Sequence, residues 1–418
     1  MGNLRNPRRS LTGWFDQPIV SILGKTAMQN QTVSHQIDSV NREAVRAHYL
    51  DWLRVLAVLG VFIFHVMNVF NEIDFFIKND ELSEPLTTFS AFFYPWGMPL
   101  FFLLAGAGSW FALQRRAPSQ YLRERFQRLL IPFVVGSILL TPIVYYFDWA
   151  HEIEPGVAHG TFLEFVKGIP FGPTPRSFGL AGYHLWFLAF LFFYSLLTLP
   201  LFQWLKEEEG QRFISQLARL CEFRGGLLLF LLPLLVVRLG LQSFFPLYLD
   251  WTDFISFLSF YIVGYLLCAD KRFIQAIRRD WLVTLAIGII AFLAAAIIST
   301  VTDELDLELV PRMPLDWAWW TFYTACSWCW TAFMLFVGIR FLNFSNKWLQ
   351  SSQEAILPFY VFHLPVIIAI SYFVVQWNVG LLPKMLAVGF SAFAVSFGLY
   401  QFIVRRISPL RAMFGMKT

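Results

Sequence analysis

An arginine and a histidine, Arg54 and His65, lie in one apolar stretch of the sequence with ten residues between them. At about 1.5 Å of rise per residue, a helix would place them roughly 16 Å apart along its axis. Ionisable side chains are costly in a membrane-spanning helix, so their presence there favours a functional role. A neutral imidazole can accept a proton from a hydroxyl nucleophile near physiological pH, which makes His65 a candidate general base.

Two further arginines, Arg125 and Arg128, stand three residues apart just before Pro132. On a helix this spacing puts both side chains on one face, and guanidinium groups bind phosphates through paired hydrogen bonds. Arg54 lies at the same predicted membrane edge, so the three arginines are candidates for an anion site. The alternative is that they only anchor their helices at the cytoplasmic membrane surface.

Two more histidines are candidates for the same site. His184 and Trp186 open an apolar stretch, where an aromatic and polar lip could receive a sugar. An interfacial anchoring belt is the alternative for that pair. His363 lies between two prolines at a depth similar to that of His65, so the two histidines could share a polar pocket. Helix packing through hydrogen bonds remains an equal alternative for His363.

The elements that must position these residues are membrane helices. Of the 418 residues, 57% are hydrophobic and only 14% are charged, whereas soluble domains are about 25% charged. Apolar runs of about 20 residues predict ten membrane-spanning helices and an all-α, polytopic membrane helix bundle. The predicted spans lie near residues 51–71, 90–113, 129–147, 184–204, 226–246, 251–269, 281–301, 317–341, 355–377 and 383–404.

The loops between these spans alternate in charge, with Lys and Arg in one set and Asp and Glu in the other. By the positive-inside rule, both termini and the basic loops face the cytoplasm. The sequence thus predicts a polar cytoplasmic arm over residues 1–48, for which disorder is one interpretation. After it come a ten-helix membrane domain over 49–406 and a short basic cytoplasmic tail over 407–418.

The sequence lacks the motifs of several other kinds of chemistry. The sequence has no Walker-type phosphate loop, nucleophile elbow or zinc-binding His-Glu-x-x-His segment. Cys326 and Cys329 lie in an apolar helix without a second pair, which favours packing, and no metal is predicted. The basic residues are dispersed through the loops, which argues against a nucleic-acid partner. Arg238, inside the fifth span, requires a carboxylate or phosphate partner that the sequence does not identify.

With these residues, the sequence resembles the membrane-bound acyltransferase 3 family. The resemblance extends over about residues 46–410 and includes every predicted span. His184-Leu-Trp-Phe-Leu188 and the overall spacing look most like the branch that contains the periplasmic-glucan succinyltransferase. Five segments carry the resemblance in order: Arg54 with ten residues before His65, Met98–Gly106, Arg125-x-x-Arg128, His184–Leu188 and Tyr360-Val-Phe-His363.

The resemblance implies an integral membrane O-acyltransferase. Such an enzyme moves a small acyl group, acetyl or succinyl, from cytoplasmic acyl-coenzyme A to a hydroxyl of a glycan or lipid-linked sugar. It would lie among the lipids of the bacterial inner membrane and modify cell-envelope polysaccharide, in an oligomeric state that the sequence leaves open. The alternative is a transporter or flippase for an anionic or sugar-linked substrate, although no inverted repeat is visible.

Roles for the candidate residues follow from the same resemblance. His65 would be the general base, or the first acceptor of the acyl group, and His363 would support it as a second catalytic residue. His184 and Trp186 would line the outer entrance for the acceptor. The phosphates of coenzyme A would be held by Arg54, Arg125 and Arg128.

Overall fold

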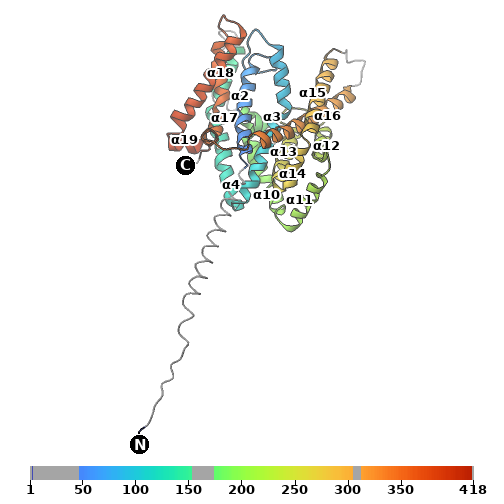
Figure 1. Ribbon diagram of the computed structural model, residues 1–418. Helices are drawn as coiled ribbons and strands as arrows, with labels where there is room; N and C mark the ends of the chain where they lie inside the picture. Colours follow the sequence, from blue (N-terminus) through green and yellow to red (C-terminus); the bar gives the residue numbers. More distant parts are fainter. Residues whose placement is uncertain (1, 3–46, 153–173, 305–311, 417–418) are drawn as a thin grey trace. The chain divides into compact units, whose positions relative to one another are not determined.

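The computed structural model describes residues 2, 47–152, 174–304 and 312–416. The chain divides into two units, Met1–His48 and Tyr49–Thr418, and the second unit forms the helix bundle. The predicted arm over residues 1–48 lies almost entirely outside the described residues. Every regular element in the described part of the chain is a helix (Figure 1), which confirms the all-α fold class.

The first half of the chain forms two long helices and then a series of shorter ones. The long helices are α2 (His48–Asn68) and α3 (Glu84–Leu113). A nearly continuous run of α4 (Pro118–Arg125), the π-helical turn η1 (Phe126–Leu130), α5 (Ile131–Leu139) and α6 (Thr141–Glu152) comes next. The shorter elements after it are α8 (Pro175–Ala181), η2 (Tyr183–Leu185), α9 (Trp186–Leu197), α10 (Leu199–Trp204) and α11 (Glu208–Leu220).

The second half contains four long apolar helices, α13 (Trp251–Ala269), α15 (Trp281–Glu304), α16 (Arg312–Phe341) and α17 (Lys347–Val374). It also contains α18 (Leu381–Gly398), which the π-helical turn η4 (Leu399–Val404) extends. The shorter elements are η3 (Gly226–Phe230), α12 (Leu231–Leu241), α14 (Lys271–Arg279) and α19 (Ser408–Met413). Helices α15 and α16 pack together on one side of the bundle, and α17 and α18 on the other (Figure 1).

The helices agree with a polytopic membrane bundle. Within the described residues, eight helices are long and apolar enough to span a membrane. Two shorter apolar helices, Tyr183–Leu197 and Gly226–Leu241, stand where the fourth and fifth spans were predicted. Some helices begin or end at other residues than the apolar runs of the sequence predicted. Helix α17 begins at Lys347 rather than near residue 355 because the side chain of Asn346 accepts the N–H of Leu349 and so caps a polar first turn.

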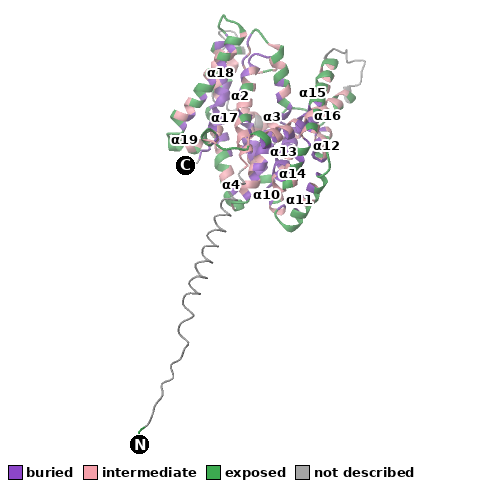
Figure 2. Cartoon of the chain, viewed as in Figure 1, coloured by how far each residue is buried: buried purple, intermediate pink, exposed green. Residues whose placement is uncertain are grey.

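The centre of the bundle is the crossing of α3 and α13, where buried residues are concentrated (Figure 2). Two glycines permit the close approach. A Cβ atom on Gly106 would lie 1.8 Å from the carbonyl oxygen of Tyr261, and one on Gly264 would lie 1.9 Å from that of Leu103. The small-residue segment around Gly106 therefore lets neighbouring helices meet at backbone distance.

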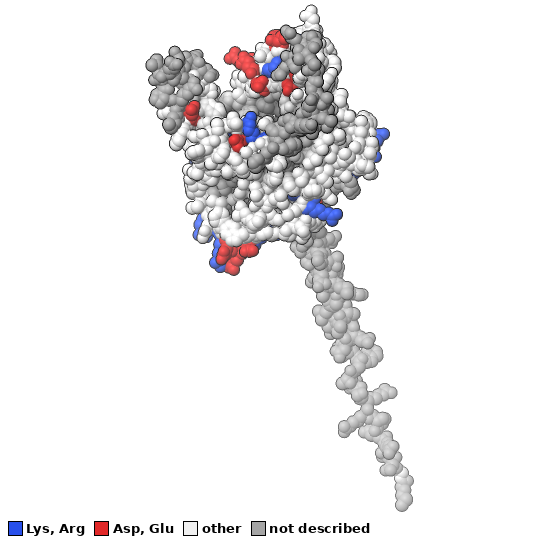
Figure 3. Space-filling model, turned by 180° about the vertical axis from the view of Figure 1, so that it is seen from behind, with Lys and Arg blue, Asp and Glu red and all other residues white. Residues whose placement is uncertain are grey.

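The periphery of the bundle is apolar. Ile297 on α15 is 63% exposed and Phe390 on α18 is 75% exposed, as expected of side chains that face lipid. Figure 3 shows acidic side chains gathered near the upper end of the visible face and a broad band with few charged atoms beneath them. Part of the C-terminal tail predicted over residues 407–418 packs against this bundle. Phe414 is buried, and its ring centroid lies 4.7 Å from that of Phe362.

Candidate active site

A cavity of about 340 Å³, called here the arginine cavity, is lined by all three arginines predicted to bind an anion. Arg54 comes from the first turns of α2, Arg125 from the end of α4 and Arg128 from η1. Tyr360 of α17 forms another part of the wall. A fourth arginine, Arg116, also lines the cavity and was not among the predicted site residues.

Arg54 is held by its own helix and by α3. Its Nη1 lies 3.2 Å from Oδ1 of Asp51, and its Nη2 donates to the carbonyl oxygen of Leu104 at 2.9 Å. Gly108 makes room for the guanidinium, because a Cβ atom there would lie 2.7 Å from Nη2. The glycine-containing segment of α3 thus positions a charged side chain as well as packing against α13.

Arg125 is oriented by neutral groups. Its Nη2 donates to Oγ of Ser109 at 3.2 Å, and its guanidinium carbon lies 4.9 Å from the centroid of the Tyr121 ring. The hydroxyl of Tyr121 donates to the same Ser109 oxygen at 3.0 Å, and the hydroxyl of Tyr261 lies 2.6 Å from it. Ser195 completes this hydroxyl cluster at 3.3 Å from Tyr261. Four helices therefore fix the position of one guanidinium.

Arg128 lies in a stretch of helix that the sequence did not predict to be irregular. Pro132 has no N–H to offer the carbonyl of Arg128, and its ring would crowd that carbonyl in an α-helix. The backbone widens here into the π-helical turn η1, in which the N–H of Ile131 bonds to the carbonyl of Phe126. The simple α-helical spacing assumed for Arg125 and Arg128 is therefore wrong, although both side chains still line the arginine cavity.

The two arginines also share a lack of acidic partners. Nε of Arg128 donates to the carbonyl oxygen of Gly415 at 3.1 Å, and Arg125 is bonded to a hydroxyl. Neither forms an ion pair with a carboxylate of the described residues, whereas Arg116 is paired with Glu124 at 2.9 Å. Their positive charges are held in place without being neutralised.

A second, much smaller cavity of about 80 Å³, called here the histidine cavity, is lined by His65, His184, Trp186 and Tyr360. His363 lies behind it. Its ring centroid is 5.3 Å from that of His65 and 5.2 Å from that of His184. The structure thus brings together three histidines that are far apart in the sequence.

Each of the three histidines has one buried ring nitrogen with no hydrogen-bond partner among the described residues. These atoms are Nδ1 of His65, Nδ1 of His184 and Nε2 of His363. The opposite nitrogens of two rings are held by backbone, since Nε2 of His184 bonds to the carbonyl of Val361 and Nδ1 of His363 to that of Tyr360. Buried polar atoms rarely lack partners, and two of these histidines, His65 and His184, line the histidine cavity.

Trp186 lies deeper inside the bundle than expected for a residue at an entrance on the membrane surface. It is only 6% exposed, its ring stacks on Phe257 at 5.6 Å, and it meets Tyr248 edge-on at 6.2 Å. His184 likewise lies against α17, because the hydroxyl of Tyr360 donates to its carbonyl oxygen. Both residues line the histidine cavity, and no signal in the sequence indicates which residues stand beyond them.

The loop over residues 69–83 lies against His65. Its Phe75 ring stacks on His65 with 5.8 Å between centroids. The loop is built around Lys78, whose ammonium donates to the backbone carbonyls of Asn68 at 2.7 Å, Ile73 at 2.6 Å and Asn71. Burial lowers the pKa of Lys78. These contacts were not predicted, because they depend on how the loop folds back on the end of α2.

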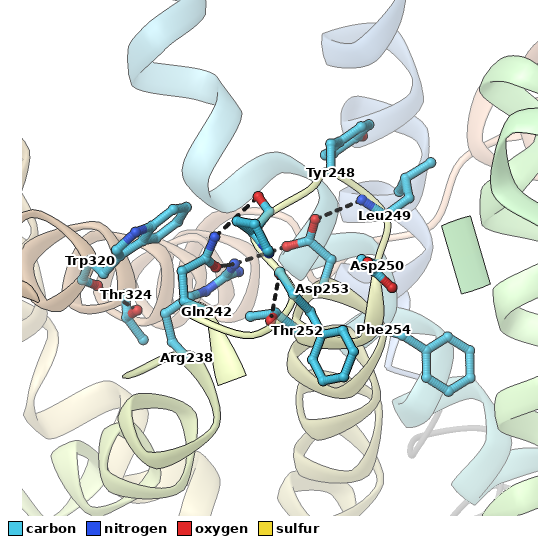
Figure 4. A network of polar contacts seen from close by, with 12 residues as sticks. Arg238, Gln242, Tyr248, Leu249, Asp250, Thr252, Asp253, Phe254, Trp320 and Thr324 are labelled. Atoms are coloured by element: carbon cyan, nitrogen blue, oxygen red, sulfur yellow. Dashed lines mark hydrogen bonds and ion pairs between the residues drawn. The ribbon is translucent and has the colours of Figure 1, made fainter. Parts of the chain in front are cut away.

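A third cavity of about 650 Å³, called here the tryptophan cavity, adjoins the histidine cavity, and the two share Tyr94, Met98 and Tyr248 as lining residues. It contains the partner of Arg238 that the sequence did not identify. Nη1 of Arg238 lies 2.9 Å from Oδ1 of Asp253, and Figure 4 shows the pair between α12 and α13. The signal in the sequence was a carboxylate two residues inside the sixth apolar span.

Cys326 and Cys329 are both buried in the packed core. Cys326 lies in a buried cluster with Ala291 and Ala325. No three His, Cys, Asp or Glu side chains are grouped as metal ligands in the parts of the chain that the structure describes.

Comparison with known proteins adds one finding. Residues 47–401 match the model of an acyltransferase domain, that of the acyltransferase 3 family. The match covers α2 to η4 and therefore includes all three cavities. No curated protein and no solved structure matches the chain.

Proposed function

This chain belongs to the acyltransferase 3 family, and from that membership we propose that it transfers a small acyl group, acetyl or succinyl, from acyl-coenzyme A to a hydroxyl of a glycan or lipid-linked sugar. Family membership supports the acyltransferase activity. One observation carries the finer proposal: Tyr360 separates the arginine cavity from the histidine cavity and lines both. A phosphate-binding site and a candidate general base therefore adjoin.

The arginine cavity suits the donor. Arg125 and Arg128 present charges without carboxylate partners in the described chain, and guanidinium groups in fixed positions bind phosphates well. The phosphates of coenzyme A would rest against these two residues and Arg54. The pantetheine arm would pass Tyr360 and bring the thioester to the histidine cavity.

His65 would act as the general base. Its Nδ1, which has no partner in the described residues, accepts the proton of the acceptor hydroxyl while that oxygen attacks the thioester carbonyl carbon. The C–O ester bond forms, the C–S bond breaks, and the proton passes from the imidazolium to the departing thiolate of coenzyme A. The neighbouring rings of His363 and His184 would orient the hydroxyl.

A two-step route, in which His65 first takes the acyl group, gives the same products. It differs in releasing coenzyme A before any acceptor is present. Acyl-coenzyme A is cytoplasmic, so either route places the arginine cavity on the cytoplasmic side. That orientation agrees with the basic loops. We accordingly propose the bacterial inner membrane as the location and a cell-envelope saccharide as the product.

Donor binding is tested by thermal unfolding of the detergent-solubilised protein with acetyl- or succinyl-coenzyme A. We expect one of them to raise the Tm of the wild type and not that of the Arg125→Ala/Arg128→Ala variant. Arg123→Ala is the matched control, because Arg123 is an exposed arginine of the same helix outside the cavity lining. If neither donor stabilises the wild type, the proposal fails and the transporter alternative takes its place.

The chemical step is tested by His65→Ala. General acid–base catalysis contributes about 10²- to 10⁴-fold, so acceptor-dependent release of free thiol from acyl-coenzyme A should fall by that factor. Donor-induced stabilisation should persist, because His65 does not line the arginine cavity. Normal turnover in this variant would exclude His65 as the base.

A further inference from the structure

We propose that the tryptophan cavity binds the saccharide acceptor, as a neutral sugar whose ring rests on the aromatic wall of α16. This assignment rests on the proposed function and names the site of its second substrate. At about 650 Å³ the cavity lies within the usual range for small-molecule sites, which are mostly apolar with a few placed polar groups.

The histidine cavity is the smallest of the three. It measures about 80 Å³, against about 340 Å³ for the arginine cavity and about 650 Å³ for the tryptophan cavity. The larger adjoining cavities suit a sugar ring better, and the arginine cavity is already assigned to the donor. The tryptophan cavity adjoins through Tyr94, Met98 and Tyr248.

The walls of the cavity suit a sugar. Trp319, Trp320 and Tyr323 form an aromatic group on α16, with ring centroids 4.6 Å apart for the two tryptophans and 5.1 Å apart for the stacked Trp319 and Tyr323. The C–H face of a pyranose is apolar and packs on such rings, whereas its hydroxyls require hydrogen bonds at the edge. Gln242 and Thr87 supply polar groups in the same lining.

The charges of the cavity disfavour an anionic ligand. Asp253 neutralises Arg238, and its Oδ2 also accepts the N–H of Leu249 at 2.9 Å. The guanidinium is further covered by Trp320, whose ring centroid lies 4.8 Å from its central carbon. Figure 4 shows Arg238 between Trp320 and Asp253. Glu72 and Glu84 add two negative charges to the lining, so a phosphate or carboxylate ligand would be repelled.

The backbone beside Tyr248 is held in a strained conformation. Leu249 has φ of 63°, a left-handed value that is unfavourable for a non-glycine residue and tends to occur at functional sites. The bond from its N–H to Asp253 maintains that conformation. One carboxylate thus neutralises Arg238 and also fixes Tyr248 at the junction of the tryptophan and histidine cavities.

The first variant of the test narrows the cavity without touching the Arg238–Asp253 pair. Ala295 lines the cavity from α15, so Ala295→Trp should occupy part of it. Leu293→Trp is the matched control, since Leu293 lies on the same helix, is 52% exposed and is not part of the lining. Trp320→Leu is a second variant, which removes aromatic surface instead of adding volume.

Each variant is returned to source cells that lack the gene, and alkali-labile acyl esters on envelope saccharides are measured. The purified full-length proteins are tested in parallel for stabilisation by acetyl- and succinyl-coenzyme A. We expect ester content to fall at least tenfold in Ala295→Trp and Trp320→Leu with donor stabilisation retained, and no change in Leu293→Trp.

Two results would overturn the assignment. Wild-type ester content in Ala295→Trp would show that the cavity is not used by the acceptor. Loss of donor stabilisation together with the esters in both variants would show that the cavity serves the donor or the fold. If the wild-type gene itself adds no ester to the deletion strain, the proposed function fails, and this outcome is recognisable before any variant is compared.

Discussion

The arginine cavity and the tryptophan cavity both contain arginines inside an apolar bundle. Arg54 and Arg116 of the arginine cavity are paired with carboxylates, but Arg125 and Arg128 contrast with Arg238 of the tryptophan cavity. Arg238 is paired with Asp253, with 2.9 Å between nitrogen and oxygen. Arg125 and Arg128 are bonded instead to a hydroxyl and to a backbone carbonyl. Neutral acceptors orient a guanidinium but leave its charge available. Under the proposed function, this difference would let one bundle offer an anion site and a site for an uncharged sugar next to the same histidines.

The partner of Arg238 and the partners of Arg125 also differ in how many helices must supply them. A buried ion pair needs only two side chains, here from neighbouring helices α12 and α13. Arg125 depends on the hydroxyl cluster of Ser109, Tyr121, Ser195 and Tyr261, which draws on α3, α4, α9 and α13. An unneutralised charge thus requires a larger supporting network, and the glycine contact between α3 and α13 supports it.

The largest effect is expected from breaking the ion pair. Asp253→Ala leaves Arg238 as an uncompensated buried charge, which typically costs about 3–5 kcal/mol. The Tm of the solubilised protein should fall markedly. The double variant Arg238→Met/Asp253→Leu should recover most of this loss, since apolar side chains of similar volume often replace a buried pair at little cost. A wild-type Tm for Asp253→Ala would mean that the pair is not buried in the membrane.

An intermediate effect is expected from making the arginine cavity resemble the tryptophan cavity. Ser109→Asp places a carboxylate beside Arg125, while Ser109→Asn, of similar size, adds no charge. Charged hydrogen bonds are worth about 1.5–3 kcal/mol, so neutralising Arg125 should raise the KM for acyl-coenzyme A about 10- to 100-fold beyond the value for Ser109→Asn. Equal KM values in the two variants would contradict a role for the free charge.

The smallest effect is expected outside both cavities, at Asp270. Its Oδ1 accepts the N–H of Arg272 at 2.9 Å and so caps α14, and its Oδ2 lies 2.7 Å from the Arg272 guanidinium. These bonds lower the pKa of Asp270. A lowered pKa stabilises the folded state above the unfolded value of about 3.9, and this contribution is lost as the pH falls through the folded value.

Asp270→Asn keeps the cap and removes the charge. At pH 7 it should cost less than about 1 kcal/mol, as is usual for exposed ion pairs. The difference in Tm from the wild type should narrow as the pH is lowered from 7 to 3. A difference that stays constant over this range would assign the effect to packing rather than to ionisation.

Counting along the apolar runs predicted which side chains could meet. His65 and His363 were placed at similar depth by counting along apolar runs, and their rings lie 5.3 Å apart. Arg54, Arg125 and Arg128 were assigned to one membrane edge by loop charge, and they share a cavity. Depth follows from helical rise alone, so it can be derived without knowing how the helices are rotated.

Rotation and lateral packing could not be predicted in this way. Whether Asp253 meets Arg238 depends on which faces of α12 and α13 adjoin, and both residues lie in spans that are apolar on every side. The π-helical turn at Phe126–Leu130 and the burial of Trp186 depend equally on neighbouring helices. The third cavity is formed by loops and five helices together, so no segment of sequence indicates it.

The carbonyl oxygens around Lys78 resemble the oxygen cage of a cation-binding loop. Many such loops are ordered by a free metal ion and unfold on dilution or chelation. Here the cation is attached to the chain and cannot dissociate. The loop that stacks Phe75 on His65 should therefore keep its fold in chelating buffers and at any calcium or magnesium concentration of the medium that it faces.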